Sequence, residues 1–276
     1  MSNQDILRKR ATLLSELNEI VQAMKNVAFA ELQRVTRERQ ALAQALAAVA
    51  GGLARCEDGT EVEGTPASHT RWLVIGAERG FCGTFNARLL EAARSLREDD
   101  PQARVLLASR RAGDQLDAAD AAGDAYAVLP GCTGVEEAPT ALDGWLAALD
   151  DEGKPGREAW VLYTADTGLA RRRLLPIPDL AGLGPVSAAP ASAGLPAHYL
   201  PLPALRAALR RQTVRLLLQS ALYASLEQEN RARLTQMQLA HEHLERLGAT
   251  LRRRQAALRQ ADITNELETL TSVLSR

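Results

Sequence analysis

Residues 237–261 read MQLAHEHLERLGATLRRRQAALRQA, and this stretch decides the fold because its apolar residues recur at alternating steps of three and four. The positions concerned are Met237, Ala240, Leu244, Leu247, Leu251, Leu258 and Ala261. Arg254 occupies the place where the pattern lacks an apolar residue. Such spacing is typical of a coiled-coil seam. After a slip of register the stripe resumes at Ile263, Leu267, Leu270 and Leu274.

Nothing interrupts the helix that this pattern predicts. No proline follows Pro203, and Gly248 is the only later glycine. Roughly 70 residues of helix would reach about 105 Å at 1.5 Å per residue. A helix of that length cannot wrap around a core of this size, so its apolar stripe needs a partner.

The other end of the chain carries a second stripe of the same kind. Its positions are Ile6, Leu13, Leu17, Ile20, Met24 and Val27, with Arg10 as the polar exception. After a shift of register, the stripe continues through Val35, Leu42 and Val49, and Gly51-Gly52 is expected to end the helix. We predict that this helix pairs with the C-terminal one as an antiparallel coiled coil.

The middle of the chain alternates short apolar runs with helical patterns. Strands are predicted at 71–75, 104–108, 125–129, 160–164 and, as an edge strand, 173–177. Helices are predicted at 85–97, 110–122 and 136–150. This alternation indicates an α/β domain with a Rossmann-like, mostly parallel sheet. The expected organisation is an N-terminal helix at 1–55, the α/β domain at 68–180, a connector at 181–203 and a C-terminal helix at 204–276.

The composition is that of a globular protein, with 46% hydrophobic and 24% charged residues among 276. The charges are segregated along the chain. Residues 1–50 hold seven Lys or Arg and five Asp or Glu, residues 203–276 hold twelve and seven, and residues 51–202 hold fourteen and twenty-two. The basic ends favour an acidic partner, although solvated arginine-rich helix faces explain much of the same pattern. We expect neither a membrane span nor a secretory signal.

The glycine-rich turn at residues 76–83, GAERGFCG, is the clearest hint of enzyme chemistry. Such a turn between strand and helix can hold phosphate. Its spacing, however, matches neither the dinucleotide nor the P-loop motif, and it lacks a lysine. We therefore expect Gly80 and Gly83 to serve backbone geometry, Cys82 to be a small buried residue, and the turn to bind no nucleotide.

The remaining reactive side chains form no pattern that indicates a site. Cys56, Cys82 and Cys132 are odd in number and lack metal-ligand spacing, so reduced thiols and no metal are expected. The four histidines, His69, His198, His241 and His243, show no relation to them. His241 and His243 would point about 200° apart on a helix, which favours a solvated face.

Carboxylates and basic residues also yield no active site or nucleic-acid site. Asp166 and Asp179 lie near strand ends, where catalytic acids can occur, but no paired carboxylate pattern appears. The basic helices lack aromatic residues for base stacking and are apolar on one face. We expect no catalytic residue, no cofactor and no nucleic-acid partner.

Four short strings spread along the chain are similar to those of one family. Residues 22–28 read QAMKNVA, residues 78–86 read ERGFCGTFN, residues 225–237 read SLEQENRARLTQM and residues 257–267 read ALRQADITNEL. They resemble, in the same order, the strings KAMxMVA, DRGLCGGFN, SLASENAARMTAM and KARQAAITQEL of the gamma subunit of F-type ATP synthases.

The resemblance implies a non-catalytic rotor shaft whose paired helices turn inside a hexamer of alpha and beta subunits. It further implies an epsilon subunit and a membrane c-ring as partners, and a peripheral place on the cytoplasmic face of a bacterial membrane. The positions that match hexamer contacts in that family are Met24, Lys25, Arg233, Arg259, Gln260, Thr264 and Glu266. Arg259 and Gln260 directly follow the seam residue Leu258, so both should point away from the paired helix.

Three departures from the family pattern are visible. Residues 239–244, LAHEHL, replace the usual ATDNA stretch, Asp262 stands where a small residue is usual, and the tail at 271–276 is more polar. They suggest a divergent branch, such as the alternative, sodium-translocating bacterial ATPases. Two other hypotheses stay open, namely a stand-alone coiled-coil scaffold with an α/β head and a nucleotide-binding α/β enzyme with helical arms.

Overall fold

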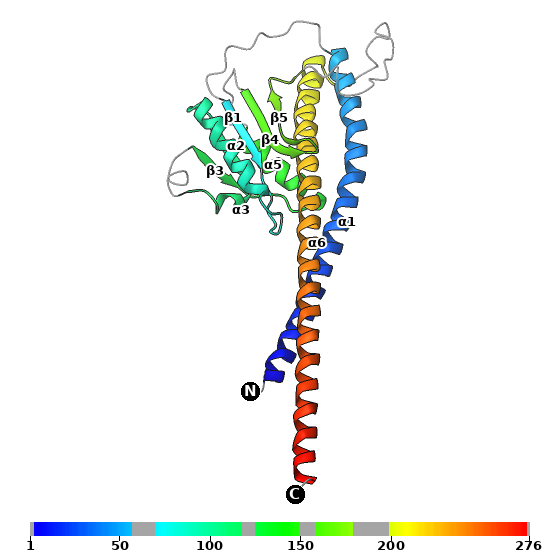
Figure 1. Ribbon diagram of the computed structural model, residues 1–276. Coiled ribbons are helices and arrows are strands. Elements are labelled where there is room, and N and C mark those ends of the chain that lie inside the picture. Colours follow the sequence, from blue (N-terminus) through cyan, green and yellow to red (C-terminus); the bar gives the residue numbers. More distant parts are fainter. Residues whose placement is uncertain (1–2, 57–69, 118–124, 150–157, 179–198, 275–276) are drawn as a thin grey trace. The chain divides into compact units, whose positions relative to one another are not determined.

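The computed structural model describes residues 3–56, 70–117, 125–149, 158–178 and 199–274 (Figure 1). The chain divides into two compact units. One consists of Met1–Phe29 with Arg233–Arg276, and the other of Ala30–Ala232. We call the first the helix pair and the second the sheet domain. Most of the predicted connector at 181–203 lies outside the described residues.

Two long helices begin and end the described chain. Helix α1 spans Asn3–Cys56 and helix α6 spans Leu202–Leu274. The prediction that α1 ends at Gly51-Gly52 is wrong, because the helix continues to Cys56. Leu53 and Cys56 are each only 2% exposed. Burial of these side chains offsets the roughly 1 kcal/mol that a glycine costs within a helix.

The sheet domain contains one five-stranded sheet in the order β3-β2-β1-β4-β5. The strands are β1 Thr70–Ile75, β2 Arg104–Ala108, β3 Tyr126–Leu129, β4 Glu158–Ala165 and β5 Gly168–Leu175. The first four are mutually parallel, and β5 runs antiparallel to β4 along one edge. The fifth strand begins earlier than predicted, because a tight turn at Asp166-Thr167 leads directly from β4 into β5.

Short helices lie along both faces of this sheet. They are α2 Phe85–Asp99, α3 Arg110–Gly113, the 3-10 turn η1 Val135–Glu137 and α5 Ala138–Leu149. The helix predicted at 110–122 is reduced to the single turn of α3 within the described residues. At its end, a side chain at Gly113 would come within 2.9 Å of Val128. The backbone therefore lies too close to β3 for a larger residue there.

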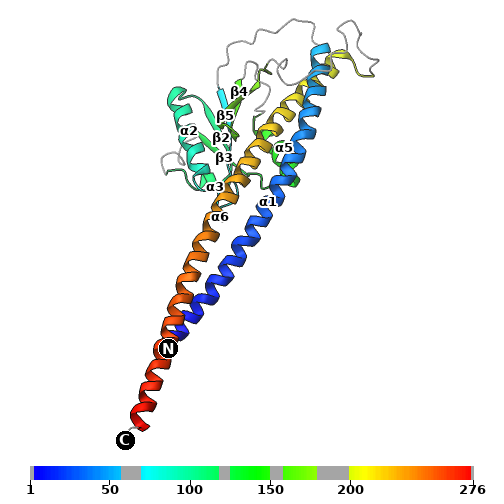
Figure 2. The same cartoon turned by 45° about the vertical axis from the view of Figure 1, so that its right-hand side comes forward.

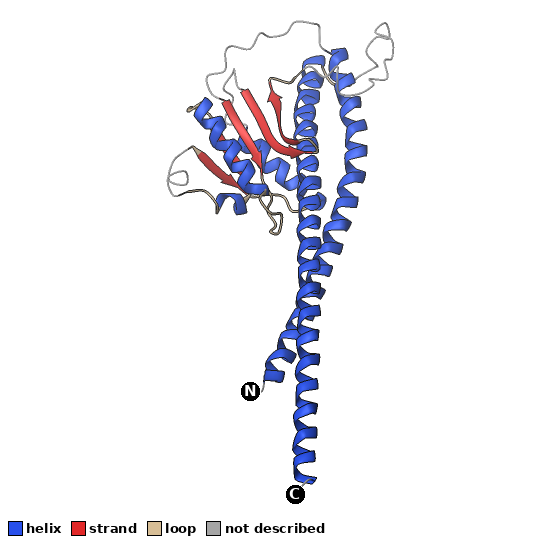
Figure 3. Cartoon of the chain, in the orientation of Figure 1, coloured by secondary structure: helices blue, strands red, loops and turns tan. Residues whose placement is uncertain are grey.

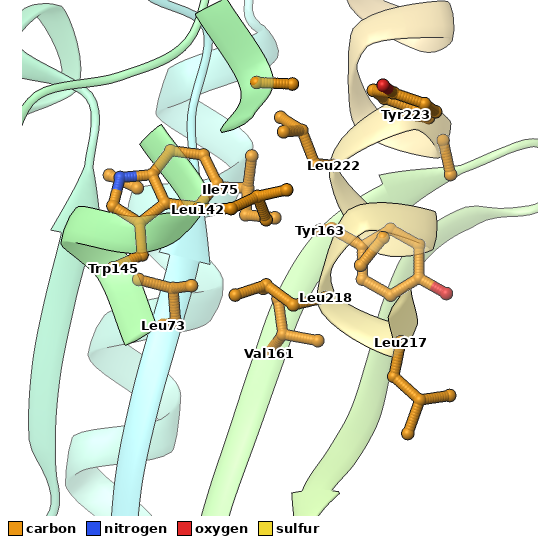
Figure 4. Close-up of a cluster of buried hydrophobic side chains, with 14 of the residues drawn as sticks. Leu73, Ile75, Leu142, Trp145, Val161, Tyr163, Leu217, Leu218, Leu222 and Tyr223 are labelled. Carbon is orange, nitrogen blue, oxygen red and sulfur yellow. The ribbon is translucent and has the colours of Figure 1, made fainter. Parts of the chain in front are cut away.

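The larger core lies between one face of the sheet and helices α5, α6 and α1. Figure 4 shows Leu142 and Trp145 of α5 beside Leu73 of β1, with Leu218 of α6 close to Val161 of β4. The Trp145 indole nitrogen donates a hydrogen bond to the carbonyl of Pro130 at 2.9 Å, so the buried ring keeps a polar partner. Full burial of each leucine contributes about 1.5–3 kcal/mol.

The opposite face of the sheet packs on α2. Val74 and Leu107 of the strands and Leu89 of the helix are completely buried there. Trp72 of β1 and Trp160 of β4 stack with their ring centroids 5.4 Å apart. The predicted fold class is thus confirmed, since two terminal helices accompany a central, mostly parallel sheet (Figure 3).

Candidate functional site

The glycine-rich turn after β1 uses its polar groups within the protein. Asn86 of α2 donates to the carbonyl of Ala77 at 2.9 Å, and its side-chain oxygen accepts from the Ala77 backbone nitrogen at 2.7 Å. The hydroxyl of Ser109 donates to the same carbonyl at 2.8 Å. Gly83 has a φ of 62°, a backbone conformation that favours glycine. The predicted geometric role of Gly83 is confirmed.

The residues beside this turn have distinct surroundings. Cys82 is 8% exposed, as predicted for a small buried side chain. Gly80 makes room for Arg111, since an added β-carbon would come within 3.2 Å of the guanidinium. Phe81 is 61% exposed and has a φ of 63°. The turn therefore presents an aromatic ring to solvent, and its backbone amide at Ala77 is already hydrogen-bonded.

Helix α6 occupies the sheet edge at which doubly wound folds bind ligands. That position lies at the carboxyl ends of β1 and β4, where the strand order reverses. The Ser225 hydroxyl donates to the carbonyl of Ile75 at 3.4 Å. Asp166, directly after β4, accepts from Arg231 at 3.0 Å and from the amide of Gln228. These contacts use the polar groups that a small ligand would need.

The described residues hold no group of three His, Cys, Asp or Glu side chains placed to bind a metal ion. His69, His198 and Asp179 lie outside them. Cys132 is buried, and burial raises the pKa of its thiol to about 11, which keeps it protonated and weakly nucleophilic. Among the helices that the structure describes, none has the length and apolar character to cross a bilayer.

One stripe of α1 is turned away from solvent along the whole helix. Its members are Leu7, Ala11, Leu14, Asn18, Val21, Lys25, Ala28, Leu32, Val35, Arg39, Leu42, Leu46, Val49, Leu53 and Cys56. They follow steps of four and three without interruption, so no shift of register precedes Val35. The predicted N-terminal seam is therefore wrong by one residue. Ile6, Leu13, Leu17, Ile20 and Val27 are instead 37–55% exposed.

The stripe of α6 that pairs with α1 contains every second residue of the predicted seam, namely Met237, Leu244, Leu251 and Leu258. It consists of Leu234, Met237, His241, Leu244, Gly248, Leu251, Gln255 and Leu258. Leu247, Arg254 and Ala261 were expected on the seam but are exposed. Pairing at 3.5 residues per turn selects the intervening places by geometry, even where polar or small residues such as His241 and Gly248 occupy them.

A layer of polar side chains connects the two helices at this seam. The Asn18 side-chain oxygen accepts from Nδ1 of His241 at 2.6 Å, and the Gln22 amide nitrogen lies 3.2 Å from Nε2. The Lys25 ammonium donates to Gln238 at 2.7 Å. These pairs show that the helices run antiparallel. The expectation that His241 belongs to a solvated face is wrong, because its side chain is only 17% exposed.

Beyond Leu258, helix α6 continues past the described part of α1. Figures 1 and 2 show its C-terminal end running past the N-terminus of α1. Every side chain described from residue 259 onward is exposed. These include Ile263, Leu267 and Leu270, which are 58%, 58% and 60% exposed. The last turns of α6 therefore carry large apolar side chains in contact with water.

The residues singled out by sequence fall into two groups. Arg259, Gln260 and Thr264 lie on the exposed end of α6, and the Thr264 hydroxyl donates to the carbonyl of Gln260 at 2.9 Å. Glu266 lies in the same helix, and its side chain is outside the description. Arg259 and Gln260 are exposed, as their place after Leu258 predicts.

The second group lies at the other end of the helix pair, which is bounded by Phe29 and Arg233. Lys25 is half-buried and bonded to Gln238, and Met24 beside it is half-buried. Arg233 is only 5% exposed. Its contact with a partner subunit stays a prediction, and in the chain alone the side chain is buried. No local pattern predicts this burial, since Arg233 and the exposed Arg231 lie only two residues apart in the same arginine-containing stretch.

The similarity to known proteins extends over both long helices and the sheet. A family model described as ATP synthase matches residues 3–273. The ATP synthase gamma chain of Maricaulis maris (strain MCS10) is 30% identical over 129 residues, which is 42% of this chain and 44% of that relative. The ATP synthase gamma chain of Ruegeria pomeroyi is 33% identical over 103 residues, 34% of this chain and 35% of that relative. The matched segments thus span less than half of each relative.

Two solved structures share the fold. In the rotor of Euglena gracilis mitochondrial ATP synthase, a chain with 15% identity superposes with a TM-score of 0.59, over 94% of this chain and 98% of its own. In the central stalk and c-ring of Tetrahymena thermophila mitochondrial ATP synthase, the corresponding figures are 15%, 0.55, 80% and 99%. At this identity the likeness concerns the arrangement of the elements.

Proposed function

This chain belongs to the gamma chain family of F-type ATP synthases, and from that premise we propose that it forms the central stalk of a rotary ATP synthase. In this role it couples rotation of a membrane ring to nucleotide chemistry in a surrounding hexamer. The chain itself carries out no catalytic step. The four sequence strings, the family match over residues 3–273 and the shared fold support this assignment.

The observation that carries the proposal is the apolar surface of the helix pair. Large apolar side chains face water as one stripe on α1 and at five positions along α6, of which the last three lie near its C-terminal end. They comprise Ile6, Leu13, Leu17, Ile20 and Val27 on α1, and Leu239, Leu247, Ile263, Leu267 and Leu270 on α6. Apolar residues at such spacing on a soluble surface mark a site of protein association. A shaft enclosed by other subunits requires such a surface.

The exposed basic residues of the helix pair favour partner subunits with acidic surfaces. Asn18 pairs with His241, so the antiparallel register brings the level of Arg8, Lys9 and Arg10 close to that of Arg252 and its neighbours. All of Arg8, Lys9, Arg10, Arg252, Arg253 and Arg254 are exposed. We infer that the alpha and beta subunits place carboxylates opposite these six basic side chains. Arg259, Gln260 and Thr264, on the exposed end of α6, are the proposed contacts with hexamer loops.

The sheet domain is proposed to face the epsilon subunit and the membrane c-ring. The solved structures that share the fold support the c-ring as a partner, because they comprise a mitochondrial rotor and a central stalk with its c-ring. We propose a peripheral place at the cytoplasmic face of a bacterial membrane. The departures in sequence at residues 239–244 and Asp262 support a divergent branch of the family, in a complex that transports protons or sodium ions.

Co-expression with the alpha and beta subunits tests this function. The full chain should co-purify with an alpha–beta hexamer. The triple variant Ile263→Ser, Leu267→Ser and Leu270→Ser should keep its helix content but lose that association. Leu169→Ser, at a 39% exposed leucine of β5, is the matched control and should bind normally. Failure of the unmodified chain to bind the hexamer would refute the proposal.

A further inference from the structure

The edge strand β5 carries three consecutive arginines, which alternate between the two faces of the sheet. Arg172 lies on the face that packs on α6, because it donates to the Ser220 hydroxyl at 3.1 Å and lies over the Tyr163 ring. Arg171 and Arg173 therefore lie on the opposite face, which packs on α2. The side chain of Arg172 thus contributes to the fold, whereas the other two arginines have different surroundings.

On the α2 side, these two arginines adjoin a pair of tryptophans. Trp160 of β4 lies opposite Arg173 in the strand register and stacks on Trp72 of β1. The guanidinium carbon of Arg171 lies 5.8 Å from the centre of the Trp72 ring, so the cation is held over an aromatic face. Leu169, on the same side of the strand, is 39% exposed. We call Leu169, Arg171, Arg173 and Trp160 the β5 face.

Helix α2 leaves the β5 face uncovered. The core on the α2 side takes apolar residues from the other four strands, and no residue of β5 belongs to it in the described part of the chain. Arg171 is exposed, and Arg173 and Trp160 are half-buried. Among the residues that the structure describes, no hydrogen bond or ion pair involves either guanidinium. Their N–H donors are therefore available to a carboxylate, which can accept two of them side by side.

The composition of the β5 face is that of a protein-binding surface. Residues 51–202 hold fourteen Lys or Arg and twenty-two Asp or Glu, so three adjacent arginines are a local excess of positive charge. Two of the three tryptophans of the chain lie beside them. Trp and Arg are enriched among the residues that carry most of the binding energy in protein interfaces. Two guanidinium groups are too few to attract an anionic membrane surface, which takes clusters of about four to eight basic residues.

We propose that the β5 face binds an extended acidic segment of the epsilon subunit. This inference rests on the proposed stalk function, in which the sheet domain faces epsilon. Arg171 and Arg173 are two residues apart, so carboxylates on alternate residues of an extended segment, about 7 Å apart, would match them. An apolar side chain of the same segment would cover Trp160 and Leu169. Because Arg171 already lies over Trp72, little of its rotamer freedom is lost on binding.

The segment is assigned to epsilon rather than to the c-ring for a structural reason. Chains that span a membrane form helices or closed barrels, in which the backbone is already hydrogen-bonded. An extended segment whose alternate side chains are free to bind a sheet face is therefore expected in the subunit outside the membrane.

The test titrates the complex, assembled without epsilon, with purified epsilon subunit. The double variant Arg171→Glu with Arg173→Glu places like charges against the acidic segment and should weaken epsilon binding at least about tenfold. Its assembly with alpha and beta should be unchanged, because the proposed hexamer contacts lie elsewhere. Arg104→Glu is the matched control and should bind epsilon normally. Arg104 is an exposed strand residue on the opposite face, in register with Arg71, which donates to carbonyls of α5.

A second double variant tests the contact without reversing its charge. Arg171→Lys with Arg173→Lys keeps both positive charges and supplies two primary amines. In the complex, a carbodiimide should couple these amines directly to Asp or Glu side chains of epsilon, and mass spectrometry identifies the linked peptide. Arg104→Lys should give no such product.

The outcomes separate this proposal from the stalk function. Normal epsilon affinity of the charge-reversed variant, or coupling of the lysines only to the c-ring or to this chain, would overturn the proposed epsilon site and leave the stalk function standing. An unmodified chain that joins no alpha–beta hexamer would refute the stalk function, and the epsilon site with it.

Discussion

The leucines of helix α6 are buried in one part of the helix and exposed in another. In the sheet domain Leu217, Leu218 and Leu222 are at most 1% exposed, whereas at the other end Leu267 and Leu270 are 58% and 60% exposed. Burial of apolar area contributes about 25 cal/mol per Å². The first group therefore stabilises the fold of this chain, while the second leaves its apolar area in water, available for the association with other subunits proposed above.

The largest expected effect concerns the buried end of this comparison. Leu222→Ala should lower the free energy of unfolding by about 2–5 kcal/mol, because it removes a fully buried side chain and leaves a cavity. Urea unfolding of the isolated chain measures this. Leu270→Ala is the matched control and should have little effect there. Equal losses at both sites would show that the exposed end of α6 is packed in the isolated chain.

The second prediction concerns function at the exposed end. Arg259→Ala or Gln260→Ala should lower ATPase turnover of the assembled complex by the loss of a charge-assisted contact, worth about 1.5–3 kcal/mol. Circular dichroism of the isolated chain should show unchanged helix content. Arg104→Ala, an exposed arginine of β2, serves as the control. Wild-type turnover in both variants would remove these residues from the proposed contact surface.

These contrasts also show what the sequence could predict. Period is a robust signal, because strand and helix repeats differ. Both long helices and the first four strands therefore have predicted bounds close to those observed. The phase of the stripe is a weaker signal. Helix α1 carries apolar residues at neighbouring positions, such as Leu13 beside Leu14 and Ile20 beside Val21. Either stripe could be the seam, and only pairing with α6 selects one.

Polar residues at the seam were harder still to predict. His241 bonds Asn18 across 223 positions of sequence, and Lys25 bonds Gln238 across 213. A periodic pattern of apolar residues treats such positions as interruptions. Burial of Glu227 was not predictable for the same reason, because its partner Arg39 lies 188 positions away in the sequence. The exposure of Arg259 and Gln260 could be predicted, because both directly follow the seam residue Leu258.

The third prediction separates specificity from stability within the helix pair. Asn18→Leu removes the oxygen that accepts from His241, and it should cost about 0.5–1.5 kcal/mol. The double variant Asn18→Leu with His241→Leu replaces the whole layer by apolar side chains and should recover this loss. Amide hydrogen exchange over residues 11–25 reports on this segment directly. Protection that stays lowered in the double variant would show that the polar layer stabilises the pair.

The smallest expected effect concerns two leucines four residues apart. Leu247 is 43% exposed, and Leu251 is half-buried on the seam. Leu247→Ala should therefore change the stability of the isolated chain by no more than about 0.5 kcal/mol, whereas Leu251→Ala should cost clearly more. The same measurement of hydrogen exchange, over residues 240–258, compares them. In the assembled complex, the difference between the losses of protection caused by the two substitutions should narrow or change sign, because Leu247 belongs to the surface proposed for partner subunits. An isolated chain that loses as much protection from Leu247→Ala as from Leu251→Ala would place the seam where the sequence pattern first indicated, and would contradict the division between buried and reserved apolar residues.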